Sequence, residues 1–239
     1  MKRVTAFIIA LTLMVGLTAC GGGEKGNASS QQPPTESQSQ TASSFDKETQ
    51  AFLDSITVDN AEFKGICGAN AMWYYKDNVL VIRGTGRIND YEWYYDKDGY
   101  EDGDTSAPWG GNLKDRVHWV IIEDGITSIG EFAFCHMKEI NKVSIPDSVT
   151  EIHEGAFLAC VQLGSLTIPA SVNTIEEDAF EAAFWEESGI EELVFEGAVP
   201  ENIDFEELFI TVGKTIRYSD SSFEPYVQNY SAEYNWIKQ

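Results

Sequence analysis

The sequence predicts an α/β solenoid, in which parallel strands from successive repeats form a short stack. Two observations lead to this prediction. The chain contains a gap-free internal repeat of 23 residues, and the apolar spacing inside each repeat changes from two to three and four. Composition agrees, because about 195 of the 239 residues follow residue 44, which suits one domain with a sizeable core.

The repeat is clearest in residues 120–134, 143–157 and 166–180, which align at a constant offset of 23. Four apolar columns and one acidic column are identical in all three copies. They are Ile122/Ile145/Ile168, Ile129/Ile152/Ile175, Ala133/Ala156/Ala179, Phe134/Phe157/Phe180 and Glu131/Glu154/Glu177. The segments are therefore copies of one structural unit.

The middle copy shows how one unit is expected to fold. Residues 142–145 have apolar side chains two apart, which predicts a short strand, and Pro146 ends it because proline cannot donate to a ladder. Later spacings suit turns and a short helical piece around residues 155–160. Stacked units then bury one core and pair their strands in parallel, about 4.8 Å apart. A decayed fourth copy, with its strand at residues 193–195, follows an insertion.

The amino terminus has the layout of a secretory signal. Lys2 and Arg3 precede the apolar residues 4–16, a run that is too short to span a bilayer. The tetrad Leu17-Thr18-Ala19-Cys20 resembles the bacterial lipobox, in which the cysteine thiol is joined to diacylglycerol. We therefore expect residues 1–19 to be removed and Cys20 to carry the lipid.

Residues 21–44 read as a disordered tether, because they hold almost only small and polar residues and no apolar residue larger than proline. A loose coil of this length reaches roughly 25–30 Å. With Cys20, the tether would hold a domain clear of the lipid head groups. The expected location is outside the cytoplasm, anchored by lipid to the cell membrane or outer membrane and exposed at the surface.

The charge narrows the class of partner. The formal net charge is −23, and loss of Lys2 and Arg3 with the signal makes it −25. Nucleic acid and anionic membrane surfaces would be repelled, so the only membrane contact expected is the lipid anchor.

Cys67, Cys135 and Cys160 remain once Cys20 is assigned to lipid. An odd number excludes a complete disulfide framework, although a single bond stays open.

The repeat resembles the BspA-like leucine-rich-repeat family, also called the Treponema pallidum type. Its units read roughly as L-x-x-(V/L)-x-I-P-x-x-(V/I)-x-x-I-x-x-x-A-F-x-x-C. The middle copy matches at Val143, Ile145, Pro146, Val149, Ile152, Ala156, Phe157 and Cys160. Glu123 replaces the proline and Met137 replaces the cysteine in the first copy. The resemblance gives Cys160 a place in the core.

The resemblance extends beyond the repeats and divides the chain. It implies an N-terminal β-rich cap over residues 45–116, leucine-rich repeats over residues 117–213, and a C-terminal strand–helix cap over residues 214–239. From the residues alone, 72–75 and 79–83 flank Lys76-Asp77-Asn78, which predicts a hairpin. Members of the family are commonly surface or secreted proteins, and some are adhesins.

The strand face is the candidate binding surface. If Val143 and Ile145 point to the core, their neighbours point outward, because alternate residues of a strand face opposite ways. The outward residues proposed to bind a ligand are Trp119, Ile121, Lys142, Ser144, Ser165 and Thr167. Alternatively, the N-terminal β segment covers Trp119 and Ile121 as a cap.

The segment 91–109 offers a second candidate surface. Trp93 and Tyr94, with their aromatic neighbours, could stack on a sugar or peptide, or could pack in the core. The acidic residues 96–104 do not fit an EF-hand loop in either frame that places glycine at position six. A solvated acidic loop is expected there, and weak calcium binding stays open.

No catalytic or cofactor motif is present in the sequence. The three histidines share no repeat column, no spacing fits a zinc site, and no nucleophile elbow or dinucleotide loop occurs. We therefore expect no enzyme activity, cofactor or metal. The leading interpretation is a surface-displayed lipoprotein that binds a protein or glycan as an adhesion module. The alternative is an assembly lipoprotein that binds another cell-envelope protein.

Overall fold

The structure is a computed structural model that describes residues 45–94, 103–181, 189–201, 203, 205, 214–232 and 234–239. The predicted signal peptide, Cys20 and the tether lie outside these residues. The elements, in chain order, begin with a helix and a group of antiparallel strands. They are α1 (Lys47–Ser55), β1 (Phe63–Ile66), β2 (Asn70–Lys76) and β3 (Val79–Arg87).

The predicted hairpin is confirmed. β2 and β3 pair in antiparallel fashion, with Lys76 opposite Val79. Asp77 and Asn78 form the two-residue turn, and both have positive φ, of 50° and 65°. Aspartate and asparagine tolerate this region better than other residues, and such turns match the twist of paired strands.

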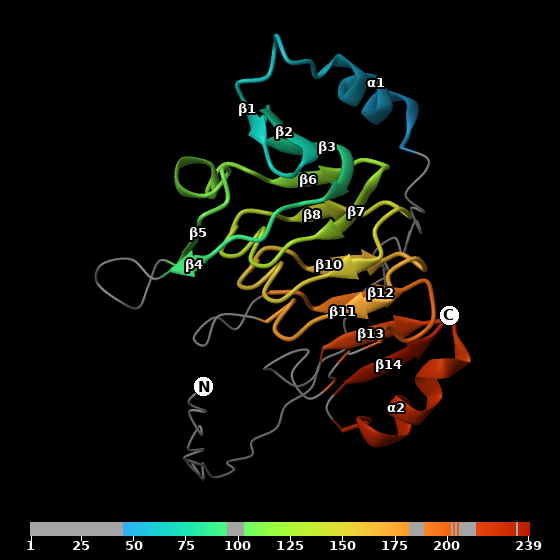
Figure 1. The fold of residues 1–239 in the computed structure, drawn as a ribbon. Coiled ribbons are helices and arrows are strands. Elements are labelled where there is room, and N and C mark those ends of the chain that lie inside the picture. Colours follow the sequence, from blue (N-terminus) through green and yellow to red (C-terminus); the bar gives the residue numbers. More distant parts are fainter. Residues whose placement is uncertain are drawn as a thin grey trace, which may run out of the picture. The chain divides into compact units, whose positions relative to one another are not determined.

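The predicted parallel stack is also confirmed, and β3 is its first rung (Figure 1). Parallel pairs join β3 to β6 and β6 to β8 in one sheet, and β10 to β12, β12 to β13 and β13 to β14 in a second sheet. β8 and β10 lie next to each other at the border of the two sheets. The bounds are β6 (Trp119–Ile122), β8 (Lys142–Ser144), β10 (Ser165–Ile168), β12 (Glu192–Phe195), β13 (Thr215–Tyr218) and β14 (Asn235–Lys238). Partners such as Trp119 and Lys142 are 23 residues apart, as the repeat requires.

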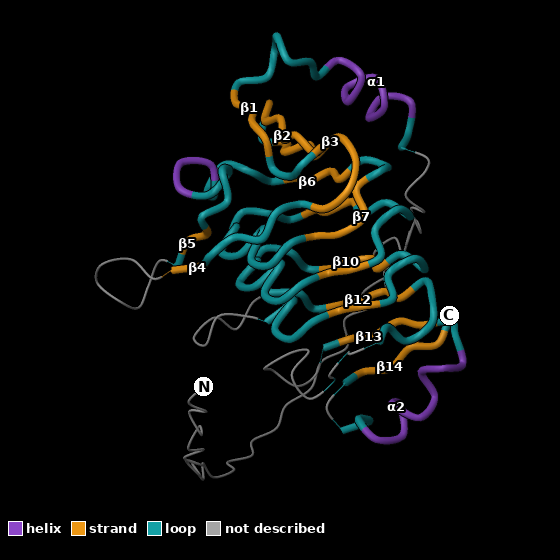
Figure 2. Tube along the Cα trace, in the orientation of Figure 1, coloured by secondary structure: helices purple, strands orange, loops and turns teal. Residues whose placement is uncertain are grey.

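Each repeat contains a second strand that the apolar pattern did not reveal. β7 (Ile126–Ile129), β9 (Glu151–Ile152) and β11 (Thr174–Ile175) pair in parallel with one another, and β7 also pairs with the end of β3. These strands are two to four residues long, too short to produce a visible alternation of polar and apolar residues. One repeat is thus two strands followed by a segment that leads to the next repeat (Figure 2). We call this segment the return leg; in the middle repeat it is residues 153–164, between β9 and β10.

The helical piece expected around residues 155–160 is wrong, because the return leg is a series of turns. Its backbone bonds to the neighbouring repeat. The Phe134 N–H donates to the Ala156 carbonyl, and the Phe157 N–H donates to the Ala179 carbonyl, both at 2.8 Å. A helix would keep these groups within its own segment. The repeats therefore form a β-solenoid, with helices confined among the described residues to the flanking segments.

The invariant columns form the core. Phe134, Phe157 and Phe180 stack on one another with ring centroids 5.3 and 6.1 Å apart. Trp109, from the segment before the first repeat, stacks on Phe134 at 5.5 Å and extends the column. Trp109 is fully buried. The cap and the repeats thus share one continuous core.

Residues 214–239, the predicted C-terminal cap, contain two further strands of the sheet that holds β10 and β12. β13 follows β12 at the repeat offset of 23, and β14 follows β13 at an offset of 20. Between them lie a 3-10 turn (Ser221–Phe223) and α2 (Glu224–Asn229). Pro225 stands in the first turn of α2, where its missing N–H has no helical partner to lose.

Candidate binding face

The outer face of the parallel strand stack carries the predicted ligand-binding residues, and the structure divides this face into a covered part and an open part. Ile121 is completely buried, so the expectation that it lies exposed is wrong. Trp119 is only half-buried. From Lys142 onward the outward residues are half-buried or exposed.

The cover is α1, which confirms the alternative that the N-terminal segment caps these positions. Leu53 and Ile56 pack with the outward residues Val79, Val81 and Ile121 in a small core of their own. The Phe45 ring meets Trp119 edge-on, with centroids 6.3 Å apart. A helix was not expected in a β-rich cap. The residue that marks the start of this helix in the sequence is Asp46, the N-cap of α1. Its carboxylate accepts hydrogen bonds from the N–H groups of Glu48 and Thr49.

Three predicted residues come together at the border of the covered part. The Lys142 ammonium lies 3.9 Å from the centre of the Trp119 ring, within the range of a cation–π interaction. On the same ring, Trp119 Nε1 donates to Ser144 Oγ at 3.3 Å. Trp119 therefore contributes an orientated apolar surface under Lys142.

The open part of the face is polar. Ser165 is exposed and Thr167 is half-buried. Ser165 Oγ donates to Glu192 at 3.4 Å, and Glu192 also accepts from Arg217 Nε at 2.6 Å. The face thus passes from an apolar region under α1 to one with hydroxyl and charged groups on adjacent strands, which suits a ligand that makes hydrogen bonds.

The family comparison agrees with this geometry. A family model described as BspA type leucine rich repeat region matches residues 113–216 in six copies. Residues 113–216 are a BspA-type leucine-rich-repeat region. The matched segment runs from the residues before β6 into β13, so it covers the strands that form the candidate face.

Three solved structures of low sequence identity match part of the chain. Pneumococcal vaccine antigen PcpA is 14% identical, with a TM-score of 0.44, over 70% of this chain and 47% of that one. A leucine rich cell surface protein from Faecalibacterium prausnitzii A2-165 is 18% identical, with a TM-score of 0.39, over 72% and 39%. A leucine-rich repeat protein from Eubacterium ventriosum ATCC 27560 is 21% identical, with a TM-score of 0.31, over 56% and 44%. The chain thus spans less than half the length of each, and no curated protein matches it in sequence.

The first BspA-type repeat lacks the proline that the next two repeats have at the equivalent position, and the structure shows why. Glu123 stands where the next two repeats have Pro146 and Pro169, and its carboxylate accepts two hydrogen bonds from Arg83, at 2.6 and 2.7 Å. Arg83 also donates to the carbonyls of Leu53 and Ile56, at 3.2 and 2.9 Å. The pair therefore fixes the C-terminal end of α1. Hydrogen bonding to Glu123 raises the pKa of Arg83.

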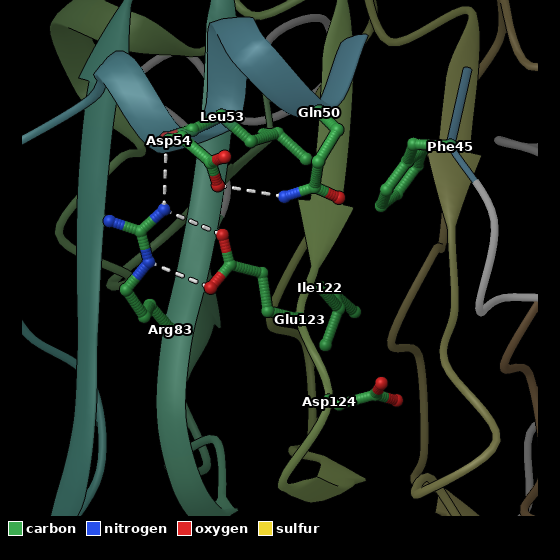
Figure 3. A pocket seen from close by; sticks show the side chains of 8 residues that line it. All are labelled: Phe45, Gln50, Leu53, Asp54, Arg83, Ile122, Glu123 and Asp124. Carbon is green, nitrogen blue, oxygen red and sulfur yellow. Dashed lines mark hydrogen bonds and ion pairs between the residues drawn. The ribbon is translucent and has the colours of Figure 1, made fainter. Parts of the chain in front are cut away.

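A cavity of about 490 Å³ lies beside this ion pair (Figure 3). Phe45, Gln50, Leu53 and Asp54 line it from the α1 side. Arg83, Ile122, Glu123 and Asp124 line it from the sheet side. No sequence pattern predicts this cavity, because its two walls are about 30 to 80 residues apart along the chain.

The aromatic run before the first BspA-type repeat is used largely for packing. Trp93 in β4 (Trp93–Tyr94) stacks against His136, with centroids 6.1 Å apart and planes 16° apart. Among the described aromatic residues of this run, Tyr94 is the exposed one, at 51%. β4 pairs with β5 (Asp104–Thr105). The acidic loop considered for calcium lies outside the described residues except at its end, where Asp104 accepts from the Gly111 N–H.

His153 joins three successive BspA-type repeats. Its Nε2 lies 2.9 Å from Ser128 Oγ, and its Nδ1 lies 3.1 Å from a Glu176 carboxylate oxygen. This order of groups is that of a serine–histidine–carboxylate relay. However, Ser128 is only 4% exposed, and Glu151 also approaches Nε2 at 3.4 Å. The arrangement therefore fits a polar link between repeats.

The three cysteines after Cys20 are buried and free. Cys160 lies in the core, as the resemblance implied, and donates to the Phe134 carbonyl at 3.1 Å. Burial raises the pKa of Cys67 and of Cys160 to about 12.

Across the described residues, no cluster of three metal-ligating side chains occurs, and no helix has the length and apolarity to cross a bilayer.

Proposed function

We propose that this protein is a non-catalytic binding module, exported and anchored by a lipid on Cys20, that presents its outer strand face to a protein or glycan. The single observation that carries the proposal is the open polar face that begins at Lys142. Hydroxyl and charged groups stand there on successive strands of the stack, with Lys142 and Ser165 exposed. Repeat solenoids commonly bind along such extended surfaces.

Because α1 covers part of the outer face, only some of the predicted residues are proposed to contact a ligand. Ile121 contributes to the contact between α1 and the sheet. Lys142, Ser144, Ser165 and Thr167 form the proposed contact surface, with Trp119 supporting Lys142. Tyr94 is the proposed contact outside the sheet, since half of its side chain is exposed.

Screening the purified protein against matrix proteins and glycans tests the face. For any ligand found, Ser165→Arg should weaken binding by roughly tenfold or more, because a long charged side chain would stand on the contact surface. Gln162→Arg is the matched control, in the exposed turn that precedes β10. Equal affinity of both variants and the unaltered protein would exclude this face.

The anchor is tested separately, by metabolic labelling of cells with an alkyne analogue of palmitate. We expect the label on the unaltered protein and on Cys67→Ala, and its loss on Cys20→Ser. Cys67 is a suitable control because it is buried and free. Unchanged labelling of Cys20→Ser would contradict the assignment of the lipid. Protease added to intact cells then reports whether the domain is displayed at the surface.

A further inference from the structure

The cavity beside α1 has the dimensions and the walls of a binding site. Its volume of about 490 Å³ falls in the usual range for ligand pockets. One wall comes from α1 and from Phe45, two residues before it. The other comes from β3, the end of β6 and the two residues that follow β6 (Figure 3). A group bound there would contact two elements that are far apart in the sequence.

The charges of the cavity exclude an anionic ligand. Arg83 is the one cation among the described residues that line it, and its guanidinium already donates to Glu123, to the Leu53 carbonyl and to the Ile56 carbonyl. A guanidinium has five N–H groups, so little donor capacity remains. Against this one positive charge stand the carboxylates of Asp54, Glu123 and Asp124.

The remaining acceptors suit a cation. Asp54 uses one oxygen to accept from Gln50 Nε2, at 2.8 Å. Asp124 is exposed, and among the described residues it has neither a hydrogen-bond partner nor an ion-pair partner. The Phe45 ring stands across the cavity from Arg83 (Figure 3), where an aromatic face can contact an alkyl chain or a positive group.

We propose that this cavity binds one basic side chain of a protein partner, the guanidinium of an arginine or the ammonium of a lysine. The carboxylates of Asp124 and Asp54 receive the charged end, and Phe45 contacts the alkyl stem. The formal charge of −23 on the whole chain favours a basic partner at longer range. This site does not depend on the strand face, since none of its lining residues belongs to the open part of that face.

Titration calorimetry on the purified protein tests the proposal with defined probes. The probes are N-acetyl-arginine methylamide, its glutamate counterpart, and a five-residue peptide with arginine between glycines. Both arginine probes should bind, and the glutamate probe should not. Asp124→Asn should weaken arginine binding roughly tenfold, because a charge-assisted hydrogen bond is lost.

Two further variants keep the outcome interpretable. Asp147→Asn is the matched control, since Asp147 is exposed and occupies the column of Asp124 one repeat later. It should bind as the unaltered protein does. Asp54→Asn should weaken binding as Asp124→Asn does.

Equal weakening in Asp124→Asn and Asp147→Asn would show general attraction to an acidic surface and would overturn the proposal. Failure of the arginine probes to bind would also overturn it. Tighter binding of the peptide than of the single amino acid supports a protein source. Equal affinities would mean that the cavity takes a free cation instead, which rejects the protein partner.

Discussion

At the scale of single residues, the turns of the return leg depend on left-handed backbone positions. Phe132, Gly155 and Asp178 occupy one repeat column and have φ values of 51°, 57° and 57°. His136 and Ala159 form a second such column, with φ values of 57° and 58°. Only one of these five positions carries glycine, so the hydrogen bonds between neighbouring repeats maintain a conformation that side chains disfavour.

Gly155 provides a test of this point. An added Cβ would lie 2.3 Å from the Phe132 ring in a backbone of positive φ, so Gly155→Ala should lower the free energy of unfolding by about 1–3 kcal/mol. Gly164→Ala is the control, because a Cβ there meets nothing within 4 Å. It should change stability by less than about 0.5 kcal/mol in urea denaturation. Similar losses in both variants would contradict the steric explanation.

The buried thiols predict a loss of stability at high pH. Burial raises the pKa of Cys67 and Cys160 from 9.0 to about 12. Above pH 9 the unfolded chain loses these protons while the folded chain keeps them. The contribution of the two thiols to the free energy of unfolding is therefore fully present below pH 9 and is lost as the pH rises toward 12. Each thiol contributes at most about 1.4 kcal/mol per pH unit. A Cys67→Ala, Cys160→Ala double variant should show a shallower decline in urea denaturation between pH 8 and 10.

At the scale of elements, α1 is held to the sheet by a small apolar contact and one ion pair. Leu53 and Ile56 supply the buried surface. Arg83 and Glu123 supply the polar link, with side chains 33% and 25% exposed. The element and its anchor were both missed in the sequence, because a nine-residue helix has little periodicity and the Arg83–Glu123 pair spans 40 residues.

Removal of the ion pair should release α1 without unfolding the repeats. Arg83→Ala leaves the Glu123 carboxylate and two carbonyls without their donor, so we expect a loss of about 1–3 kcal/mol in the stability of the α1 contact. Hydrogen exchange should show faster exchange in α1 and unchanged exchange in β10 and β12. Arg87→Ala is the control, because its pair with Asp90 is exposed and should be worth under about 1 kcal/mol. Protected α1 amides in Arg83→Ala would exclude this role.

At the scale of the whole molecule, one aromatic column connects the cap to the repeats. Trp109, Phe134, Phe157 and Phe180 stack in sequence order, so each ring packs against the next repeat. In a stack of repeats, stability depends on such contacts between neighbours. A defect at the centre should therefore weaken the coupling on both sides.

Phe157→Ala should lower the free energy of unfolding by about 3–5 kcal/mol, because a fully packed ring is replaced by a cavity. It should also broaden the denaturation curve as the coupling between the two halves weakens. Phe63→Ala, at a ring that is 45% exposed, should cost about 1 kcal/mol or less and leave the curve sharp. A small loss in Phe157→Ala would mean that the stack can collapse around the defect.

The sequence by itself determined the solenoid, its rung spacing and its core columns, because a 23-residue repeat forces equivalent residues into register. It also placed Lys142, Ser144, Ser165 and Thr167 on one outer face, since side chains alternate along a strand. Only the tertiary structure decided that Ile121 is buried and that a cavity lies beside Arg83. Both depend on where α1 packs. That position is set by contacts between distant residues, which leave no periodic signal in the sequence.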